Sequence, residues 1–411
     1  MMTYKETTEW MFSRLPMYQA QGASAYRKDL TNTILLCSHL GNPEKNLKFI
    51  HVAGTNGKGS TSHMLASIFM DAGYKTGLFT SPHLLDFRER IKVNGKEISE
   101  SYVVQFIKRQ KDFFDVRDMS FFEMTVGLAF DYFLHERVDI VILETGLGGR
   151  LDSTNVVTPE LSIITNIGLD HTAFLGDTLE AIAGEKAGII KPSVPVVIGE
   201  YTSETKNVFE EKAALCDSPI YFAEDFTGEI FPSDLKGDYQ QKNIRTVLQS
   251  IDVLQKKGFI VNIENIKSGL MNVVKNTGLQ GRWQQLREHP KVVCDTAHNG
   301  HGLELVMQQV QEEKYEQLHM VFGMVNDKNP DDIFPLLPAD AQYYFCRPDI
   351  PRGMDTTVLL EKTTAYGFVG NAYISVSEAY DAALTRAGKD DFIYIGGSTF
   401  VVAEILQKSI N

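Results

Sequence analysis

Short apolar runs alternate along the chain with longer segments of helical periodicity, and this alternation predicts an α/β fold. Apolar runs of strand length fall at 49–53, 75–80, 139–144, 161–167 and 194–199. Such runs are typical of buried parallel strands. Helical patterns fall at 60–71, 121–134, 178–187 and 239–256. Strands that alternate with helices indicate a doubly wound parallel sheet with helices on both faces.

A second alternating series begins at Lys291. Its expected strands are 291–295, 318–322, 342–346 and 392–395, and its expected helices are 302–313, 356–364 and 376–386. The polar, glycine-containing segment 276–287 separates the two series and is the expected hinge. Because 411 residues are too many for one ordinary core, we predict two α/β domains. They are a P-loop-type N-terminal domain over 1–285 and a smaller Rossmann-like domain over 286–411.

Composition narrows the class of protein. A hydrophobic content of 43% with 23% charged residues is that of a globular protein. No apolar run approaches the roughly 20 residues of a membrane span, and the N-terminal segment lacks a signal-peptide pattern. The four scattered cysteines suggest free thiols and a cytoplasmic location. The net charge of −13 argues against nucleic-acid binding.

The most informative segment is 47–62, where an apolar strand leads into a glycine-rich loop and then a helix. The loop residues are Gly54, Thr55, Asn56, Gly57, Lys58, Gly59 and Ser60. Backbone N–H groups, a helix dipole and a lysine together favour bound phosphate. The usual P-loop pattern has Ser or Thr directly after the lysine, whereas Gly59 intervenes here. The segment predicts a phosphate cradle, with a structural turn and a surface lysine as the alternative.

Polar side chains also stand just past expected strands, where the ligands of open parallel sheets bind. They are Ser81, Glu144 and His171. A hydroxyl, a carboxylate and an imidazole beside ATP phosphates suit Mg²⁺, or Mn²⁺ because of the histidine. The structural alternatives are a helix cap for Ser81, a surface acid for Glu144, and a capping or packed histidine for His171.

Six further segments extend the pattern in the same order as in one known family. They are 80–83, 144–150, 168–171, 185–189, 281–282 and 295–299. With the Gly-Thr-Asn-Gly-Lys-Gly-Ser loop, the chain resembles the folylpolyglutamate synthase/dihydrofolate synthase family, of bacterial bifunctional type, within the Mur ligase superfamily. The resemblance covers nearly the whole chain and implies that Ser81, Glu144 and His171 hold the catalytic metals. It also implies that Lys186, which lies in a mostly small and apolar helical segment, is carbamylated; an exposed lysine is the alternative.

The resemblance assigns roles to residues of the substrate and nucleotide sites. Phe122 and Asp152 would line the pterin pocket. The alternative is that Phe122 is a residue of the hydrophobic core. Asn243 would contact adenine, Arg282 would reach the ATP phosphates, and Asp295 would act at the nucleotide. The structural alternatives are an exposed helix residue for Asn243 and a strand-end turn for the Asp295 segment.

Some positions depart from the family pattern. Tyr239 replaces a histidine and Thr296 replaces a glycine, and the Gly-Ser-Leu-Tyr segment near the C-terminus is Gly-Ser-Thr-Phe around Ser398. The roles of these three positions stay open. His298 matches the family pattern and, with Lys58 and Lys186, completes the expected catalytic set. The resemblance also implies that the C-terminal domain closes the site.

The implied reaction is ATP-dependent ligation of L-glutamate to dihydropteroate or reduced folylpolyglutamates, through an acyl phosphate and with release of ADP and phosphate. The expected cofactors are ATP and Mg²⁺, or Mn²⁺. We expect a monomer that acts on small molecules, without nucleic-acid or membrane partners. The rival functions are a Mur-type ligase of cell-wall precursors, a P-loop NTPase or kinase, and a non-catalytic ATP-gated module.

Overall fold

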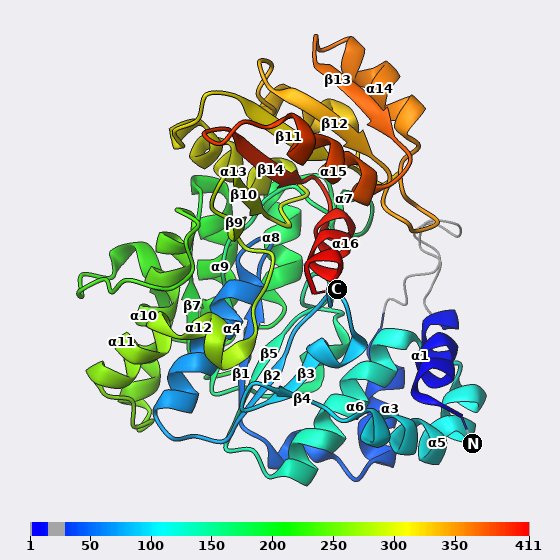
Figure 1. The fold of residues 1–411 in the computed structure, drawn as a ribbon. Coiled ribbons are helices and arrows are strands. Elements are labelled where there is room, and N and C mark those ends of the chain that lie inside the picture. Colours follow the sequence, from blue (N-terminus) through cyan, green and yellow to red (C-terminus); the bar gives the residue numbers. More distant parts are fainter. Residues whose placement is uncertain (1, 15–28, 411) are drawn as a thin grey trace. The chain divides into compact units, whose positions relative to one another are not determined.

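The computed structural model describes residues 2–14 and 29–410 and divides into two compact units. The first unit comprises Met1–Asp234 and Gln241–Gly278, as far as these residues are described. The second comprises Leu235–Gln240 and Leu279–Asn411, with the same restriction. Each unit has its own sheet, shown in blue to green and in yellow to red in Figure 1.

Within the described residues, the first unit holds an eight-stranded sheet in the order β4-β3-β2-β5-β1-β6-β7-β8. The strands are β1 (Phe49–Ala53), β2 (Thr76–Phe79), β3 (Ile91–Val93), β4 (Lys96–Glu97), β5 (Ile140–Glu144), β6 (Leu161–Ile164), β7 (Val196–Ile198) and β8 (Ile220–Phe222). Strands β2, β5, β1, β6, β7 and β8 run parallel, whereas β3 and β4 form an antiparallel edge. The carboxyl ends of β1, β2, β5 and β6 therefore meet at one edge.

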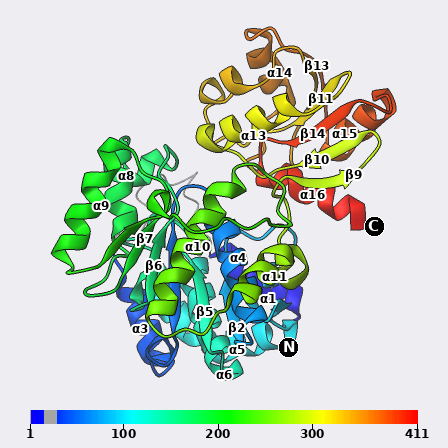
Figure 2. The same cartoon turned by 90° about the vertical axis from the view of Figure 1, so that its left-hand side faces the viewer.

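The helices of the first unit are α1 (Tyr4–Ser13), α3 (Thr31–His39), α4 (Lys58–Asp71), α5 (Glu100–Arg117), α6 (Phe121–Glu136), α7 (Thr172–Leu175), α8 (Leu179–Ala187), α9 (Ser203–Leu215), α10 (Gln240–Lys256), α11 (Ile263–Met271) and α12 (Val273–Thr277). Its 3₁₀ helices are η2 (Pro43–Asn46), η3 (Phe87–Arg90), η4 (Ser153–Val156) and η5 (Ala223–Asp225). Figure 2 shows α4, α10 and α11 along this sheet.

The two ends of β1 join different clusters of the core, although the side chains of Phe49 and Ala53, four residues apart, lie on the same face of the strand. Phe49 joins a cluster with α5 and α6, in which its ring meets that of Phe130 edge to face, with ring centroids 5.3 Å apart. Ala53 joins a second cluster formed by β6, β7, α8 and α9. Helix α4 packs against β1, β2 and β5. The loop between β1 and α4 is therefore held between two packed elements.

Within the described residues, the second unit holds a six-stranded sheet in the order β13-β12-β11-β14-β10-β9. The strands are β9 (Gln284–Arg287), β10 (Lys291–Cys294), β11 (Leu318–Phe322), β12 (Gln342–Cys346), β13 (Val369–Tyr373) and β14 (Phe392–Gly396). The helices are α13 (Gly300–Glu312), α14 (Thr356–Thr364), α15 (Val376–Arg386) and α16 (Thr399–Ile410), with η6 (Pro330–Asp332) and η7 (Phe334–Leu336). All of these strands are parallel except β9, which pairs antiparallel with β10.

The prediction of two α/β folds is confirmed, and the expected strands and helices are present within a few residues of their predicted ends. The segment 276–287, which is the expected hinge, contains strand β9 over its last four residues, and its role as a hinge stays a prediction. Only alternate residues of this edge strand are half-buried, so its sequence is too polar to resemble a core strand. The two units divide after Gly278, and the functional boundary at residue 285 stays a prediction.

The described ranges 2–14 and 29–410 contain no helix that could span a membrane. None of the helices there combines the length and the apolar character that crossing a membrane requires.

Candidate active site

The glycine loop (residues 54–60) joins β1 to α4 with a backbone that only glycine fits at two positions. Gly54 and Gly57 have φ of +149° and +81°, and Gly57 caps the N-terminus of α4. A Cβ on Gly54 would lie 1.8 Å from the hydroxyl oxygen of Thr165. A Cβ on Gly57 would lie 2.3 Å from Oδ1 of Asn243. The loop is therefore closely packed, and the expected adenine contact, Asn243, lies directly against it.

The end of β6 anchors the other side of the glycine loop. The backbone N–H of Thr55 donates to the Asn166 carbonyl and that of Asn56 to Asn166 Oδ1, both at 2.9 Å. The Thr165 hydroxyl donates to the Asn56 carbonyl at 2.5 Å. Sequence reasoning missed Thr165 and Asn166, although two polar residues directly after a buried strand were a usable signal.

Two lysines converge on one carbonyl of the glycine loop. Lys58 Nζ donates to the Gly54 carbonyl at 2.9 Å and to the Thr55 carbonyl at 3.1 Å. Lys186 Nζ, which comes from the last turn of α8, donates to the same Gly54 carbonyl at 2.8 Å. The structure thus brings together two residues of the expected catalytic set that are separated by more than 100 positions in the sequence.

The ammonium group of Lys186 has a lowered pKa. Lys186 is only 4% exposed, and burial, with repulsion from Lys58 as a second cause, lowers its pKa to about 7. Asp170 and Asp152 act in the opposite direction. A substantial fraction of Lys186 is therefore a neutral amine at neutral pH, and a neutral amine is nucleophilic.

We expect Gly57→Ala to weaken ATP binding by about tenfold or more, because the new methyl group displaces Asn243 and distorts the loop. Gly73→Ala is the matched control, since Gly73 has a similar φ of +87° but no atom within 4 Å of the added Cβ. Calorimetric titration with ADP and a thermal melt of each variant provide the measurement. Equal affinities for the two variants would contradict the close packing of Asn243 against the loop.

Two of the expected metal ligands lie together at the carboxyl edge of the sheet. Glu144, 3% exposed, ends β5, and its Oε2 lies 3.4 Å from the backbone N of Ser81. The Thr145 hydroxyl beside it is buried and has no hydrogen-bond partner in the part of the chain that the structure describes. A buried carboxylate with oxygen donors nearby fits a hard divalent cation.

His171, the third expected metal ligand, is more exposed than Glu144. It caps α7 with φ of +51°, its side chain is 47% exposed, and Nε2 lies 3.9 Å from Asp170 Oδ2. Across residues 2–14 and 29–410, no group of three or more His, Cys, Asp or Glu side chains is arranged to hold a metal. The expected set contains only two such side chains, so its metal role stays a prediction.

A buried arginine beside Glu144 was not anticipated from the sequence. Arg90 is 8% exposed, lies over the Phe121 ring and donates through Nε to His83 Nδ1 at 2.6 Å. Burial lowers its pKa to about 10, opposed by the charges of Glu89 and Glu144. His83 is kept neutral because burial, with the charge of Arg90, lowers its pKa to about 3. Arg90 thus adds positive charge near the expected metal ligands.

The second glycine segment (residues 146–152) follows β5 and packs against the expected pterin residues. A Cβ on Gly146 would lie 2.4 Å from the Phe122 ring, which is half-buried. Asp152 is 4% exposed and accepts hydrogen bonds from the backbone N–H groups of Gly146 and Leu147, both at 2.8 Å. It also accepts from the backbone and hydroxyl of Thr154. A donor group on a ligand would therefore have to share the oxygens of Asp152 with these donors of the protein.

In the second unit, the expected residues gather after β10. Asp295 is 2% exposed, whereas His298 is half-buried and its Nδ1 lies 2.9 Å from the Thr296 carbonyl oxygen. Arg282 Nη1 donates to the Thr296 hydroxyl. Ser398 accepts from the backbone of Phe400, which is the contact of a helix cap for α16. Arg282 and His298 thus both contact Thr296, the residue next to Asp295, and the three expected residues lie close together in this unit.

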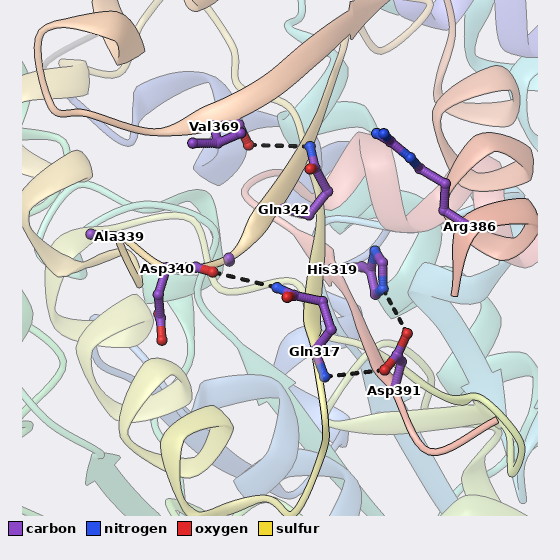
Figure 3. Close-up of a pocket in the computed structure, with 9 residues that line it drawn as sticks. Gln317, His319, Ala339, Asp340, Gln342, Val369, Arg386 and Asp391 are labelled. Carbon is purple, nitrogen blue, oxygen red and sulfur yellow. Dashed lines mark hydrogen bonds and ion pairs between the residues drawn. The ribbon is translucent and has the colours of Figure 1, made fainter. Parts of the chain in front are cut away.

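The second unit also has a pocket of about 420 Å³ at the amino ends of its strands (Figure 3). His319 Nε2 lies 3.1 Å from Asp391 Oδ2, and Gln342 donates to the Val369 carbonyl. Asp391 also accepts from the backbone of Gln317. Only His319 and Asp391 pair side chain to side chain among these contacts, and the pocket is lined by none of the residues expected from the sequence. It lies at the opposite edge of this sheet from Asp295.

Two family models match successive parts of the chain. The Mur ligase middle domain matches residues 52–273, and the Mur ligase glutamate ligase domain matches residues 281–399. The first range contains the glycine loop, and the second contains the cluster around Asp295.

Curated relatives extend over nearly the whole chain. A dihydrofolate synthase/folylpolyglutamate synthase of Bacillus subtilis is 32% identical over 441 residues, covering 98% of this chain and 99% of the relative. A probable bifunctional folylpolyglutamate synthase/dihydropteroate synthase of Haloferax volcanii is 32% identical over 98% of this chain, which spans 50% of that longer protein.

Solved structures share the fold. Escherichia coli FolC in complex with DHPP and ADP is 29% identical, with a TM-score of 0.83 over 98% of this chain and 97% of that one. A bifunctional folylpolyglutamate synthase/dihydrofolate synthase with Mn, AMPPNP and L-glutamate bound is 28% identical, with a TM-score of 0.81 over 94% and 95% of the two chains. On the domain match and the full-length relatives, the chain belongs to the folylpolyglutamate synthase/dihydrofolate synthase family of the Mur ligases.

Proposed function

We propose that the protein is an ATP-dependent ligase that joins L-glutamate to dihydropteroate and to reduced folylpolyglutamates. The observation that carries this proposal is the glycine loop, where Lys58 and Lys186 meet at the Gly54 carbonyl in a chain of this family. A relative bound to DHPP and ADP, and another bound to AMPPNP and L-glutamate, support the substrates.

The proposed reaction has two steps. An oxygen of the substrate carboxylate attacks the γ-phosphorus of ATP, and the bond to the bridging oxygen breaks to release ADP. The amine nitrogen of L-glutamate then attacks the acyl carbon of the resulting acyl phosphate, loses a proton and expels phosphate. Lys58 and the N-terminus of α4 offset the negative charge of the phosphates. Most of the rate acceleration then comes from positioning and electrostatics.

Glu144 and Ser81, with His171, are the residues that would hold Mg²⁺ or Mn²⁺. The buried carboxylate fits such an ion, as does the Thr145 hydroxyl, which has no partner within the described residues. When bound, the ion supplies positive charge that offsets the charge of the transferring phosphoryl group.

The pterin ring of the substrate is proposed to lie beside Phe122. That ring is half-buried, lies against Gly146 and meets the Phe79 ring edge to face at a centroid distance of 6.0 Å, so a stacked pterin ring would add to these contacts. Asp152 faces the same segment through Gly146 and Leu147, and it would accept from ring N–H groups only by sharing its oxygens with these donors.

Residues of both units are proposed to serve the same reaction. Asn243, packed against Gly57, is the proposed adenine contact. Arg282 is proposed to bind the ATP phosphates, and Asp295 and His298 are proposed to act at the nucleotide. Carbamylation of Lys186 is part of this proposal.

A single assay decides between the candidate functions: the release of ADP with each carboxylate, with and without L-glutamate. We expect ADP release that requires both L-glutamate and either dihydropteroate or a reduced folate. Activity on one of these two carboxylates alone would narrow the protein to one of the two ligase activities.

The rival functions predict other outcomes in the same assay. ADP release that requires a UDP-linked peptide precursor would indicate a cell-wall ligase. ADP release without any acceptor would indicate an NTPase, and nucleotide binding without release would indicate a binding module. The cytoplasmic location and the monomeric state stay predictions.

A further inference from the structure

Asp295 receives hydrogen bonds from three different stretches of the second unit. Its Oδ2 accepts from the Tyr239 hydroxyl at 2.6 Å and from the Trp283 backbone N–H at 2.7 Å. Its Oδ1 accepts from the Ala297 backbone N–H at 2.8 Å. Because the carboxylate is 2% exposed, these donors fix its direction with little competition from water.

The Tyr239 hydroxyl stays protonated, so it always acts as the donor in its hydrogen bond to Asp295. Burial, and next the charge of Asp295, raise its pKa well above the usual value for a tyrosine, so the hydroxyl keeps its proton throughout the working pH range. The ring is held in place as well, since a Cβ on Gly237 would lie 2.6 Å from it. Tyr239 therefore links the segment Leu235–Gln240 to the end of β10.

Thr296 orients the Arg282 side chain through a hydrogen bond. Its hydroxyl accepts from Arg282 Nη1, and its backbone N–H donates to the Gly281 carbonyl at 3.0 Å. In the described parts of the chain, no ion pair joins Arg282 to a carboxylate, and no protein acceptor binds its Nε or Nη2. A neutral hydroxyl thus orients the guanidinium while its charge and its remaining donors stay available to an anion.

Both tyrosine and threonine stand where the family pattern has another residue, histidine at position 239 and glycine at position 296. A glycine has no side chain to accept from Arg282. Thr296 therefore supplies an acceptor that glycine lacks, and the contacts of Tyr239 and Thr296 both end on residues that are proposed to act on the nucleotide.

We propose that Tyr239 and Thr296 are positioning residues, which fix the directions of the Asp295 carboxylate and the Arg282 guanidinium before substrates bind. This inference rests on the proposed function, since it matters only if Asp295 and Arg282 serve the ligase reaction. Tyr239 acts on Asp295, and Thr296 acts on Arg282, so the two contributions are separable by mutation.

For Tyr239, the test is Tyr239→Phe, with Tyr343→Phe as the matched control. Tyr343 is also fully buried in this unit, and its hydroxyl donates to the Pro338 carbonyl at 2.7 Å. We expect Tyr239→Phe to lower kcat about tenfold or more, while Tyr343→Phe leaves kcat within about twofold of the wild type.

The pH profile separates positioning from mere stability. The titratable groups that face Asp295 are Tyr239, Arg282, Cys294 and Tyr394. Burial raises the pKa of Asp295, and the Tyr239 hydroxyl opposes this rise more than Arg282 does. Loss of the hydroxyl should therefore move the acidic limb of the kcat profile to higher pH. A lower melting temperature with unchanged kcat and an unchanged pH profile would overturn the role of Tyr239.

For Thr296, the variants are Thr296→Val, which keeps the shape and removes the acceptor, and Thr296→Ser, which restores it. We expect Thr296→Val to raise KM for ATP and Kd for ADP about tenfold, and Thr296→Ser to remain near the wild type. Thr363→Val controls for loss of a buried hydroxyl in the same unit. Equal nucleotide affinity for the Val and Ser variants would overturn the role of Thr296.

Failure of the inference is distinguishable from failure of the proposed function. A wild-type protein without glutamate-dependent ADP release overturns the proposed function and this inference with it. A wild-type protein that turns over, together with variants at both positions that match it, overturns only the positioning roles. If Tyr239→Phe does not fold, Tyr239→Leu, which also removes the hydroxyl and cannot donate to Asp295, takes its place with the same two readouts.

Discussion

Lys58→Ala is expected to reduce ligase turnover by at least about 10³-fold and to leave the fold intact. Lys58 is half-exposed in the glycine loop, and among the residues that the structure describes its ammonium group donates only to the Gly54 and Thr55 carbonyls. Those contacts hold the side chain over the loop, where phosphates are proposed to bind. Loss of the ammonium removes a point charge from the transferring phosphoryl group, whereas loss of two partly exposed hydrogen bonds costs little stability.

The control for this experiment is Lys257→Ala in the same unit. Lys257 also donates to a backbone carbonyl, that of Glu160, at 2.7 Å, but it lies outside the candidate site. Turnover, ADP affinity and melting temperature are measured for both variants. A folded Lys58→Ala protein with near-normal turnover would remove the glycine loop from the mechanism.

Regular, strongly apolar elements of this fold were predictable from the sequence. Strands β1, β11 and β12 lie where the apolar runs place them, because each is buried along its whole length or nearly so. The edge strand β9 was missed because it is half-exposed and polar. Edge strands lack the continuous apolar signal of central strands.

The candidate site was predictable as a set of residues but not as a set of contacts. The glycine-rich pattern places Lys58 in a loop just before a helix, yet no local pattern shows that Lys186 reaches the same carbonyl. Thr165 and Asn166 were missed because the expected strand 161–167 includes both residues, whereas β6 ends at Ile164. Arg90 was missed because arginines are rarely buried, so a sequence gives no reason to expect one beside Glu144.

Lys186 is expected to be carbamylated in the active protein, and its surroundings supply the chemical reason. Because its pKa is about 7, Lys186 is a neutral amine in about half of the protein molecules at pH 7. The amine nitrogen attacks the carbon of CO₂, a C–N bond forms, and one proton is released to give the carbamate anion. The reaction replaces the repulsion between Lys186 and Lys58 by attraction, because the new group is negative.

The sign of the pH dependence follows from this chemistry. Only the neutral amine reacts, so carbamate occupancy should rise as the pH increases through the pKa of about 7. Carbon-13 NMR of protein equilibrated with labelled bicarbonate measures that occupancy directly. Lys191 is the internal comparison, since it is half-buried and donates to the Asn155 carbonyl at 2.9 Å, outside the glycine loop.

Lys186→Ala should lose most of the ligase activity, and acetate should restore part of it. The truncated side chain leaves space beside the Gly54 carbonyl and Lys58, where a small carboxylate meets the ammonium that a carbamate would otherwise meet. Lys191→Ala should keep its activity and show no response to acetate, which controls for a general effect of the anion. A high-resolution map with unmodified Lys186 in a metal-loaded, fully active protein would refute carbamylation, and full activity of Lys186→Ala without acetate would remove the residue from the mechanism altogether.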